Sequence, residues 1–195
     1  AARGLFHKAI VQSGAHLHAL QPALATAHAE KLLQAPGVQT SELASLHELP
    51  LERVLEAYER VAPVSGSRVS FSPVTDGRSL PREPWKPAAP AVSAHVPLLI
   101  CSTRTETTLL VGGRDPSVFE LDDAGLRQRV AGWLRGSDVD SIVESFRKLH
   151  PQASPSELFF LITSDLYARC PGWAQADRKA AQANNDDSLQ PDLDR

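Results

Sequence analysis

Two short segments of apolar residues predict β-strands. Residues 7–13 (HKAIVQS) are suited to β-structure and end at the turn residue Gly14. Residues 96–101 (VPLLIC) form a continuous apolar run, which is typical of a strand buried on both faces of a parallel sheet. We therefore expect both segments to be core strands.

Helical spacing of apolar residues predicts helices between and after these strands. The predicted helices cover residues 22–35, 51–58, 126–134, 139–149 and 155–166. The clearest start signal is Ser154-Pro155-Ser156-Glu157, where Ser154 caps the helix, Pro155 fits its first turn and Glu157 completes a capping box. The order strand, helices, loop, strand, helices predicts an α/β fold with a mostly parallel sheet and flanking helices.

A long proline-rich segment, residues 61–95, separates the second predicted helix from the second predicted strand. Its Asp76-Gly77 pair marks a tight turn, in which Asp76 either caps local backbone N–H groups or fixes the loop. Long loops in compact domains are usually functional or disordered, so we expect this one to form a wall of a binding cleft. Trp85 either lines that cleft or covers the core.

Composition and charge exclude several classes of protein. The 195 residues are 42% hydrophobic and 22% charged, as in an ordinary soluble globular domain. The net charge is -3 and the basic residues are scattered, so we expect no nucleic-acid partner. No apolar stretch approaches the roughly 20 residues of a membrane span.

Localisation and domain extent follow from the same features. Cys101 and Cys170 form no disulfide framework and are expected to be reduced structural thiols, and the start does not resemble a signal peptide. These features favour the cytoplasm, with an upstream signal peptide left open. Residues 1–183 are expected to form one partial domain, and residues 184–195, rich in aspartate and lacking aromatic residues, a disordered tail.

Glu106 is the main candidate for chemistry. It follows the apolar run 96–101 in a turn-like segment, and ligands of open α/β sheets bind beyond the carboxyl ends of such strands. The alternative is a solvated loop carboxylate. Ser13 lacks the preceding glycine of a nucleophile motif and is interpreted as a structural turn residue.

The histidines do not indicate a metal or a cofactor. His16, His18 and His28 lack the i, i+4 spacing of a zinc pair, so we expect neither a metal site nor a cofactor. His150 stands before Pro151 at a predicted helix end, where it favours the helix dipole. The arginines Arg127, Arg129 and Arg135 are interpreted as part of a solvated helix face.

Several segments, in order along the chain, resemble a known family. They are residues 1–14 (AARGLFHKAIVQSG), residues 71–77 (FSPVTDG) with the following Leu80-Pro81 and Pro84, residues 96–100 (VPLLI), residues 163–167 (TSDLY) and residues 173–182. Together they resemble the type-B carboxylesterases, the α/β-hydrolase branch that includes para-nitrobenzyl esterases and cholinesterases. The resemblance extends over about residues 1–183.

This resemblance implies a partial α/β-hydrolase fold and hydrolysis of small-molecule carboxylic esters by a Ser-His-Glu triad. In such a triad the serine attacks the ester carbonyl, the histidine relays its proton, and the carboxylate holds and stabilises the imidazole. Backbone N–H groups stabilise the oxyanion. Glu106 matches the position of the acid.

The chain also departs from the family pattern. The Gly-x-Ser-x-Gly elbow does not occur in it, and the His-Gly motif of the catalytic histidine finds no match, so both are expected in sequence outside these residues. Thr105 and Thr107 replace the usual Asp and Gly beside the acid; a β-branched residue excludes a positive-φ turn, which leaves Glu106 open to displacement. We expect a middle-to-C-terminal fragment that is inactive alone. The alternative is a truncated or decayed, non-catalytic product acting at most as a binding module.

Overall fold

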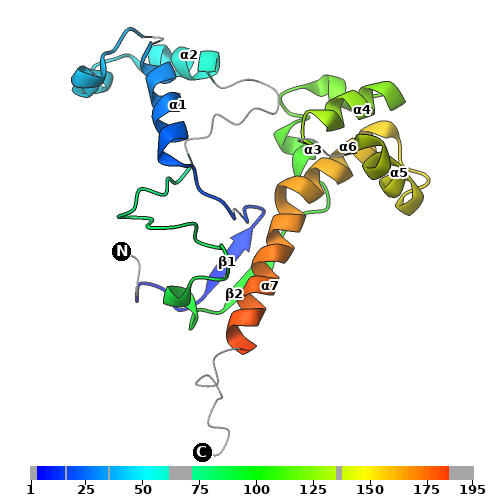
Figure 1. Ribbon diagram of the computed structural model, residues 1–195. Coiled ribbons are helices and arrows are strands. Elements are labelled where there is room, and N and C mark those ends of the chain that lie inside the picture. Colours follow the sequence, from blue (N-terminus) through cyan, green and yellow to red (C-terminus); the bar gives the residue numbers. More distant parts are fainter. Residues whose placement is uncertain (1–3, 16, 35, 62–71, 135–137, 185–195) are drawn as a thin grey trace, which may run out of the picture. The chain divides into compact units, whose positions relative to one another are not determined.

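The computed structural model describes residues 4–15, 17–34, 36–61, 72–134 and 138–184 (Figure 1). The chain divides into two compact units, one formed by Ala1–Leu17 and Pro84–Arg195 and the other by His18–Glu83. The single partial domain over 1–183 stays a prediction. All but the first residue of the predicted tail lie outside the described residues.

The first unit contains a two-stranded parallel sheet. Strand β1 (Ala9–Gln12) pairs with β2 (Leu98–Cys101), in the register Ala9 with Leu98 and Gln12 with Cys101. Both strands are shorter than the predicted segments. Their parallel pairing places the two carboxyl ends at the same edge of the sheet.

The expectation that β2 is buried on both faces is wrong. Its residues alternate in burial, and Leu99 is 59% exposed. The side chain of Ile100 turns to the other face, where it packs near Gly172 of helix α7 (Cys170–Asn184). Because α7 covers only one face, alternate side chains remain accessible. Cys101 shares the exposed side, so it is not the buried core thiol that the apolar run indicated.

Six helical elements of the first unit, described between β2 and α7 in the sequence, pack together around one buried helix, α6 (Pro155–Ser164). They are α3 (Glu106–Leu110), η3 (Pro116–Phe119), α4 (Asp123–Ala131), α5 (Val139–Leu149), α6 itself and η4 (Asp165–Arg169), the last a single π-helical turn that leads into α7. The helix predicted over residues 126–134 corresponds to α4, which ends at Ala131 with Gly132 as its C-cap, earlier than expected.

Helix α6 confirms its start signal. The Ser154 hydroxyl accepts from the backbone N–H of Glu157 at 3.2 Å, and the Glu157 carboxylate accepts from the backbone N–H of Ser154 at 2.7 Å. The buried surface of α6 is wider than the predicted apolar face, however, because Phe159, Phe160 and the polar residues near the helix end are buried as well. The reason is tertiary: α3, α4 and α5 all pack against α6.

The core of this layer is built from apolar side chains of α4, α5, α6 and η3. Its completely buried members are Val118, Leu126, Val130, Val143 and Leu158. Val143 lies on the predicted apolar face of α5, whereas Leu149 of the same helix is 73% exposed.

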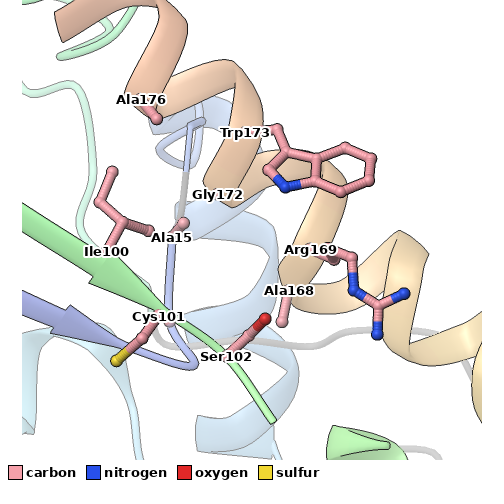
Figure 2. Close-up of a pocket in the computed structure, with 10 residues that line it drawn as sticks. Ala15, Ile100, Cys101, Ser102, Ala168, Arg169, Gly172, Trp173 and Ala176 are labelled. Atoms are coloured by element: carbon pink, nitrogen blue, oxygen red, sulfur yellow. The ribbon is translucent and has the colours of Figure 1, made fainter. Parts of the chain in front are cut away.

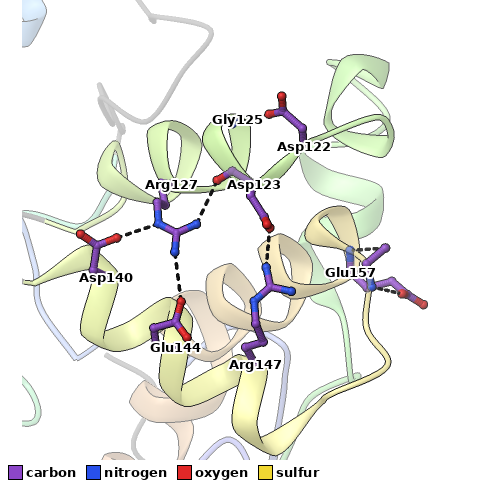
Figure 3. A network of polar contacts seen from close by, with 9 residues as sticks. Asp122, Asp123, Gly125, Arg127, Asp140, Glu144, Arg147 and Glu157 are labelled. Carbon is purple, nitrogen blue, oxygen red and sulfur yellow. Dashed lines mark hydrogen bonds and ion pairs between the residues drawn. The ribbon is translucent and has the colours of Figure 1, made fainter.

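Ion pairs join the outer surfaces of α4 and α5 (Figure 3). Arg127 contacts Asp140 at 2.7 Å and Glu144 at 3.0 Å, and Arg147 pairs with Asp123. The Arg127 side chain, expected on a solvated helix face, therefore forms ion pairs that link α4 to α5 at the surface. Arg135, assigned to the same face, lies outside the described residues.

The segment after Pro84 is tied to α7 by basic side chains. The Lys179 ammonium donates to the backbone oxygens of Ser93 at 2.7 Å and Ala94 at 2.8 Å, at the end of the short helix η2 (Ala91–Ser93). Arg178 donates to the oxygen of Trp85 at 2.7 Å. Burial lowers the pKa of Lys179, because desolvation disfavours its charged form.

The second unit contains α1 (Pro22–Gln34), the 3-10 segment η1 (Thr40–His47) and α2 (Leu51–Val61). Helices α1 and α2 pack together, and an isolated bridge joins Leu20 to Val74. Asp76 accepts hydrogen bonds from the N–H groups of Arg78 and Leu80, both at 2.9 Å, so it caps its own turn. These two bonds lower the pKa of Asp76.

Candidate active site

Glu106 lies just beyond the carboxyl end of β2, where it is the first residue of α3. The sequence predicted a turn-like loop at this point, and the structure shows that the loop ends at Thr105. An acidic residue in a first helical turn interacts favourably with the positive end of the helix dipole. Glu106 is half-buried, at the edge of the sheet where β1 also ends.

Two donors hold one oxygen of the Glu106 carboxylate. The Ser13 hydroxyl donates to Oε1 at 2.5 Å, and the backbone N–H of Thr103 donates to the same oxygen. The other oxygen, Oε2, accepts no hydrogen bond from the described part of the chain. One carboxylate oxygen is thus anchored and the other is available to a further donor.

The hydrogen bonds decide the protonation state of Glu106. Partial burial raises its pKa, but the bonds from Ser13 and Thr103 favour the charged form and together leave the pKa below the ordinary value. The side chain is therefore an ionised acceptor at neutral pH. A charged acceptor can orient a neighbouring imidazole and stabilise its protonated form.

Ser13 has a role that the sequence interpretation did not include. It follows β1 with φ of 57°, a left-handed conformation that is uncommon for residues other than glycine, and its N–H donates to the oxygen of Cys101 at 2.9 Å. This backbone places the hydroxyl against Glu106. The sequence signal that could have indicated this contact was the expected parallel pairing of the two strands, because their carboxyl ends then lie at the same edge of the sheet. The absence of a preceding glycine only argued against Ser13 as the nucleophile.

The departure at Thr107 does not require a positive-φ turn. Thr107 lies inside α3 and is completely buried, and Thr105 before the acid has φ of -136°. A β-branched residue is compatible with both conformations. Whether Glu106 occupies the position of a triad acid stays a prediction.

A small cavity of about 110 Å³ lies beside the Glu106 loop (Figure 2). Its lining comes from the ends of both strands, from η4 and from α7: Gly14, Ala15, Ile100, Cys101, Ser102, Ala168, Arg169, Gly172, Trp173 and Ala176. In Figure 2 the Ser102 hydroxyl points toward the helices, and the Cys101 sulfur points away from them. Residues 84–95, the part of the proline-rich segment that belongs to this unit, do not line the cavity, and the cleft-wall role of the segment stays a prediction.

The described ranges contain no group of three His, Cys, Asp or Glu side chains that could hold a metal ion. His18 lies 3.7 Å from Glu83, and His28 is buried in α1. His16 lies outside the described residues.

Within the described part of the chain, no helix is long and apolar enough to cross a bilayer.

The sequence of this chain matches a family of known proteins. A model of the carboxylesterase family matches residues 1–158. The para-nitrobenzyl esterase of Bacillus subtilis (strain 168) is 30% identical over 165 residues, which are 83% of this chain and 32% of that protein. The chain therefore spans about a third of the length of this curated relative.

Solved esterase structures match the fold. The carboxylesterase EST55 of Geobacillus stearothermophilus aligns with a TM-score of 0.71 and 26% identity, over 93% of this chain and 37% of that chain. A PNB esterase aligns with a TM-score of 0.60 and 27% identity, over 92% of this chain and 37% of that chain. The parallel strands and flanking helices fit part of the α/β-hydrolase fold of these enzymes, and with the family match over residues 1–158 the chain belongs to the carboxylesterase family.

Proposed function

We propose that this chain supplies the acid of a Ser-His-Glu triad in a carboxylic-ester hydrolase, and that Glu106 is that acid. The observation that carries the proposal is the Glu106 carboxylate, ionised and anchored through Oε1 at the carboxyl ends of two parallel strands. Ligand sites of open α/β sheets occupy this edge. Membership of the carboxylesterase family and the similarity to para-nitrobenzyl esterase support ester hydrolysis as the reaction.

The proposed chemistry assigns Glu106 a supporting part. A serine attacks the ester carbonyl while a histidine removes its proton, and the histidine then returns the proton to the leaving alcohol. Oε2 of Glu106 accepts the hydrogen bond of the imidazole, holding the correct tautomer and stabilising the imidazolium. Ser13 and Thr103 keep Oε1 from rotating into that place.

The serine and the histidine belong, in this proposal, to parts of the enzyme outside the 195 residues. The Gly-x-Ser-x-Gly sequence does not occur among them. The Glu106 carboxylate accepts no hydrogen bond from a histidine in the described part of the chain. We therefore propose that the chain alone does not hydrolyse esters, because the covalent step has no nucleophile.

A first experiment measures hydrolysis of a short-chain p-nitrophenyl ester by the purified chain and by Glu106→Gln, with circular dichroism to verify that both are folded. We expect no rate above the buffer blank from either protein. Hydrolysis by the chain that is lost in Glu106→Gln would refute the proposal, because it would require a nucleophile within these residues.

A second experiment tests the triad role directly in a chimera. Residues 1–183 replace the matching segment of the B. subtilis para-nitrobenzyl esterase, and Glu106→Gln is compared with Glu120→Gln, whose side chain is exposed. Replacing a triad acid lowers kcat by roughly 10⁴-fold, so we expect that loss for Glu106→Gln and little change for the control. An active chimera that tolerates Glu106→Gln would refute the assignment.

A further inference from the structure

A cluster of three buried hydroxyl groups lies where α3, the helix that begins at Glu106, packs against the end of α6. Thr107, the next residue along α3, and Thr163 are completely buried, and Ser164 is 1% exposed. Thr163 and Ser164 are the last two residues of α6. The cluster therefore joins the helix that carries Glu106 to the most buried helix of the unit.

The hydrogen bonds of this cluster are mutually consistent. The Thr163 hydroxyl donates to the backbone oxygen of Phe159 at 2.7 Å, so its own oxygen can accept from the Thr107 hydroxyl at 2.6 Å. The Thr107 hydroxyl also has the backbone oxygen of Phe160 within reach as an acceptor, at 3.3 Å, and lies 3.0 Å from the Ser164 hydroxyl. The Ser164 hydroxyl oxygen accepts from the backbone N–H of Thr107 at 3.1 Å. Buried polar groups with complete partners rigidify the surrounding structure, whereas a group that loses its partner destabilises it.

A second contact holds the other side of the Glu106 loop. Arg169, at the end of η4, donates to the backbone oxygen of Arg104 at 3.0 Å and pairs with Asp165 one helical turn earlier. Glu106 thus lies between two anchored backbone positions, Arg104 and Thr107. Both anchors are supplied by the continuous segment from α6 into η4.

Helix α3 needs such anchors because it has only five residues. A helix of that length is not stable by itself, since the first turn fixes several residues for a single hydrogen bond. Without tertiary contacts, its start would not hold a carboxylate against the donors that follow β1 and β2, Ser13 and Thr103. The alignment of hydrogen bonds weakens steeply with small displacements.

We propose that Thr107, Thr163 and Ser164 are positioning residues that hold the Glu106 carboxylate on the Ser13 hydroxyl and the Thr103 N–H. None of the three hydroxyl groups donates to the carboxylate; they act through the backbone of α3. The inference rests on the proposed role of Glu106 for its catalytic meaning. The threonine that departs from the family glycine thereby becomes part of the support for the acid.

The test measures the titration of the Glu106 side-chain carboxyl carbon by NMR in the full 195-residue chain, comparing Ser164→Ala with Ser156→Ala. Both serines are buried on α6 and accept from a backbone N–H of another segment, Thr107 at 3.1 Å and Leu121 at 3.0 Å. The control therefore loses the same kind of N–H bond at the far end of the helix, whereas Ser164→Ala also loses the contact with the Thr107 hydroxyl at 3.0 Å.

We expect Ser164→Ala to raise the pKa of Glu106 and to shift the amide resonance of Thr103. The loosened helix weakens the bonds that favour the charged carboxylate, while partial burial continues to favour the neutral form. Ser156→Ala should lower the melting temperature and leave the Glu106 titration unchanged. Equal titration curves in wild type and Ser164→Ala would overturn the proposal.

A second pair of variants covers the case in which Ser164→Ala does not fold. Thr107→Val removes the hydroxyl and keeps the shape, whereas Thr107→Ser keeps the hydroxyl. We expect the pKa of Glu106 to rise in Thr107→Val and to return toward the wild-type value in Thr107→Ser. Identical values in the two variants would contradict a role for the hydroxyl.

These readouts separate the inference from the proposed function. A chimera that tolerates Glu106→Gln refutes the triad acid without affecting the measured link between Ser164 and the carboxylate. Conversely, an unchanged Glu106 titration in Ser164→Ala and Thr107→Val refutes the positioning role and leaves the triad assignment to the chimera.

Discussion

Ser13 and Glu106 are 93 positions apart in the sequence, and the Ser13 hydroxyl donates a 2.5 Å hydrogen bond to the Glu106 carboxylate. The parallel register of β1 and β2 makes this contact possible, because it places the residues after Gln12 and Cys101 at one edge of the sheet. Hydrogen bonds to ionised acceptors are shorter and stronger than those between neutral groups. The strand pairing therefore brings the two side chains together, and the charge of the carboxylate strengthens the hydrogen bond between them.

Ser13→Ala should raise the pKa of Glu106, since the change removes a donor that favours the charged form and leaves the partial burial in place. We also expect the free energy of unfolding to fall by about 1 kcal/mol. An NMR titration and a urea unfolding curve measure the two effects. Ser145→Ala, an exposed serine of α5, should change neither; an unaltered Glu106 titration in Ser13→Ala would show that the bond does not persist in solution.

Glu106 should make the stability of the chain depend on acidity. Because the pKa of the folded state is below the ordinary value of 4.5, the stabilisation by the charged carboxylate is complete above that value and is lost as the pH falls through the folded pKa. The melting temperatures of wild type and Glu106→Gln should therefore differ most near neutrality and converge in acid. A difference that grows on acidification would contradict the sign of the pKa shift.

Ser154→Ala should destabilise α6 at its first turn. The variant loses the hydroxyl that accepts from the N–H of Glu157, and replacing such a cap by alanine costs about 1 kcal/mol. Chemical denaturation provides the measurement. Glu157→Gln keeps an acceptor for the N–H of Ser154 and should have the smaller effect, so a larger loss in this variant would argue against the capping box.

Leu126→Ala should be among the most destabilising single changes in the helical layer. Leu126 is completely buried in the core cluster, where truncation of leucine to alanine typically costs about 2–5 kcal/mol. Leu149→Ala is the matched control, because Leu149 is 73% exposed and a surface change there should stay within about 0.5 kcal/mol. Similar losses for the two variants would place the core elsewhere.

The helices could be predicted from the sequence because their signals are local. The capping box of α6 uses residues three positions apart, and the buried Val143 of α5 lies on the predicted apolar face. The extent of burial was harder to predict. A continuous apolar run indicated two buried faces for β2, yet Leu99 is exposed, because α7 covers one face of the sheet.

The candidate site divides in the same way. The sequence by itself determined the family resemblance, the place of Glu106 after an apolar strand, and the absence of a Gly-x-Ser-x-Gly elbow from these residues. Only the tertiary structure decided the partners: Ser13 joins Glu106 across 93 positions, and Ser164 joins Thr107 across 57. Such contacts depend on strand register and on helix packing. No pattern of neighbouring residues encodes them, so they could not be derived from periodicity or motifs alone.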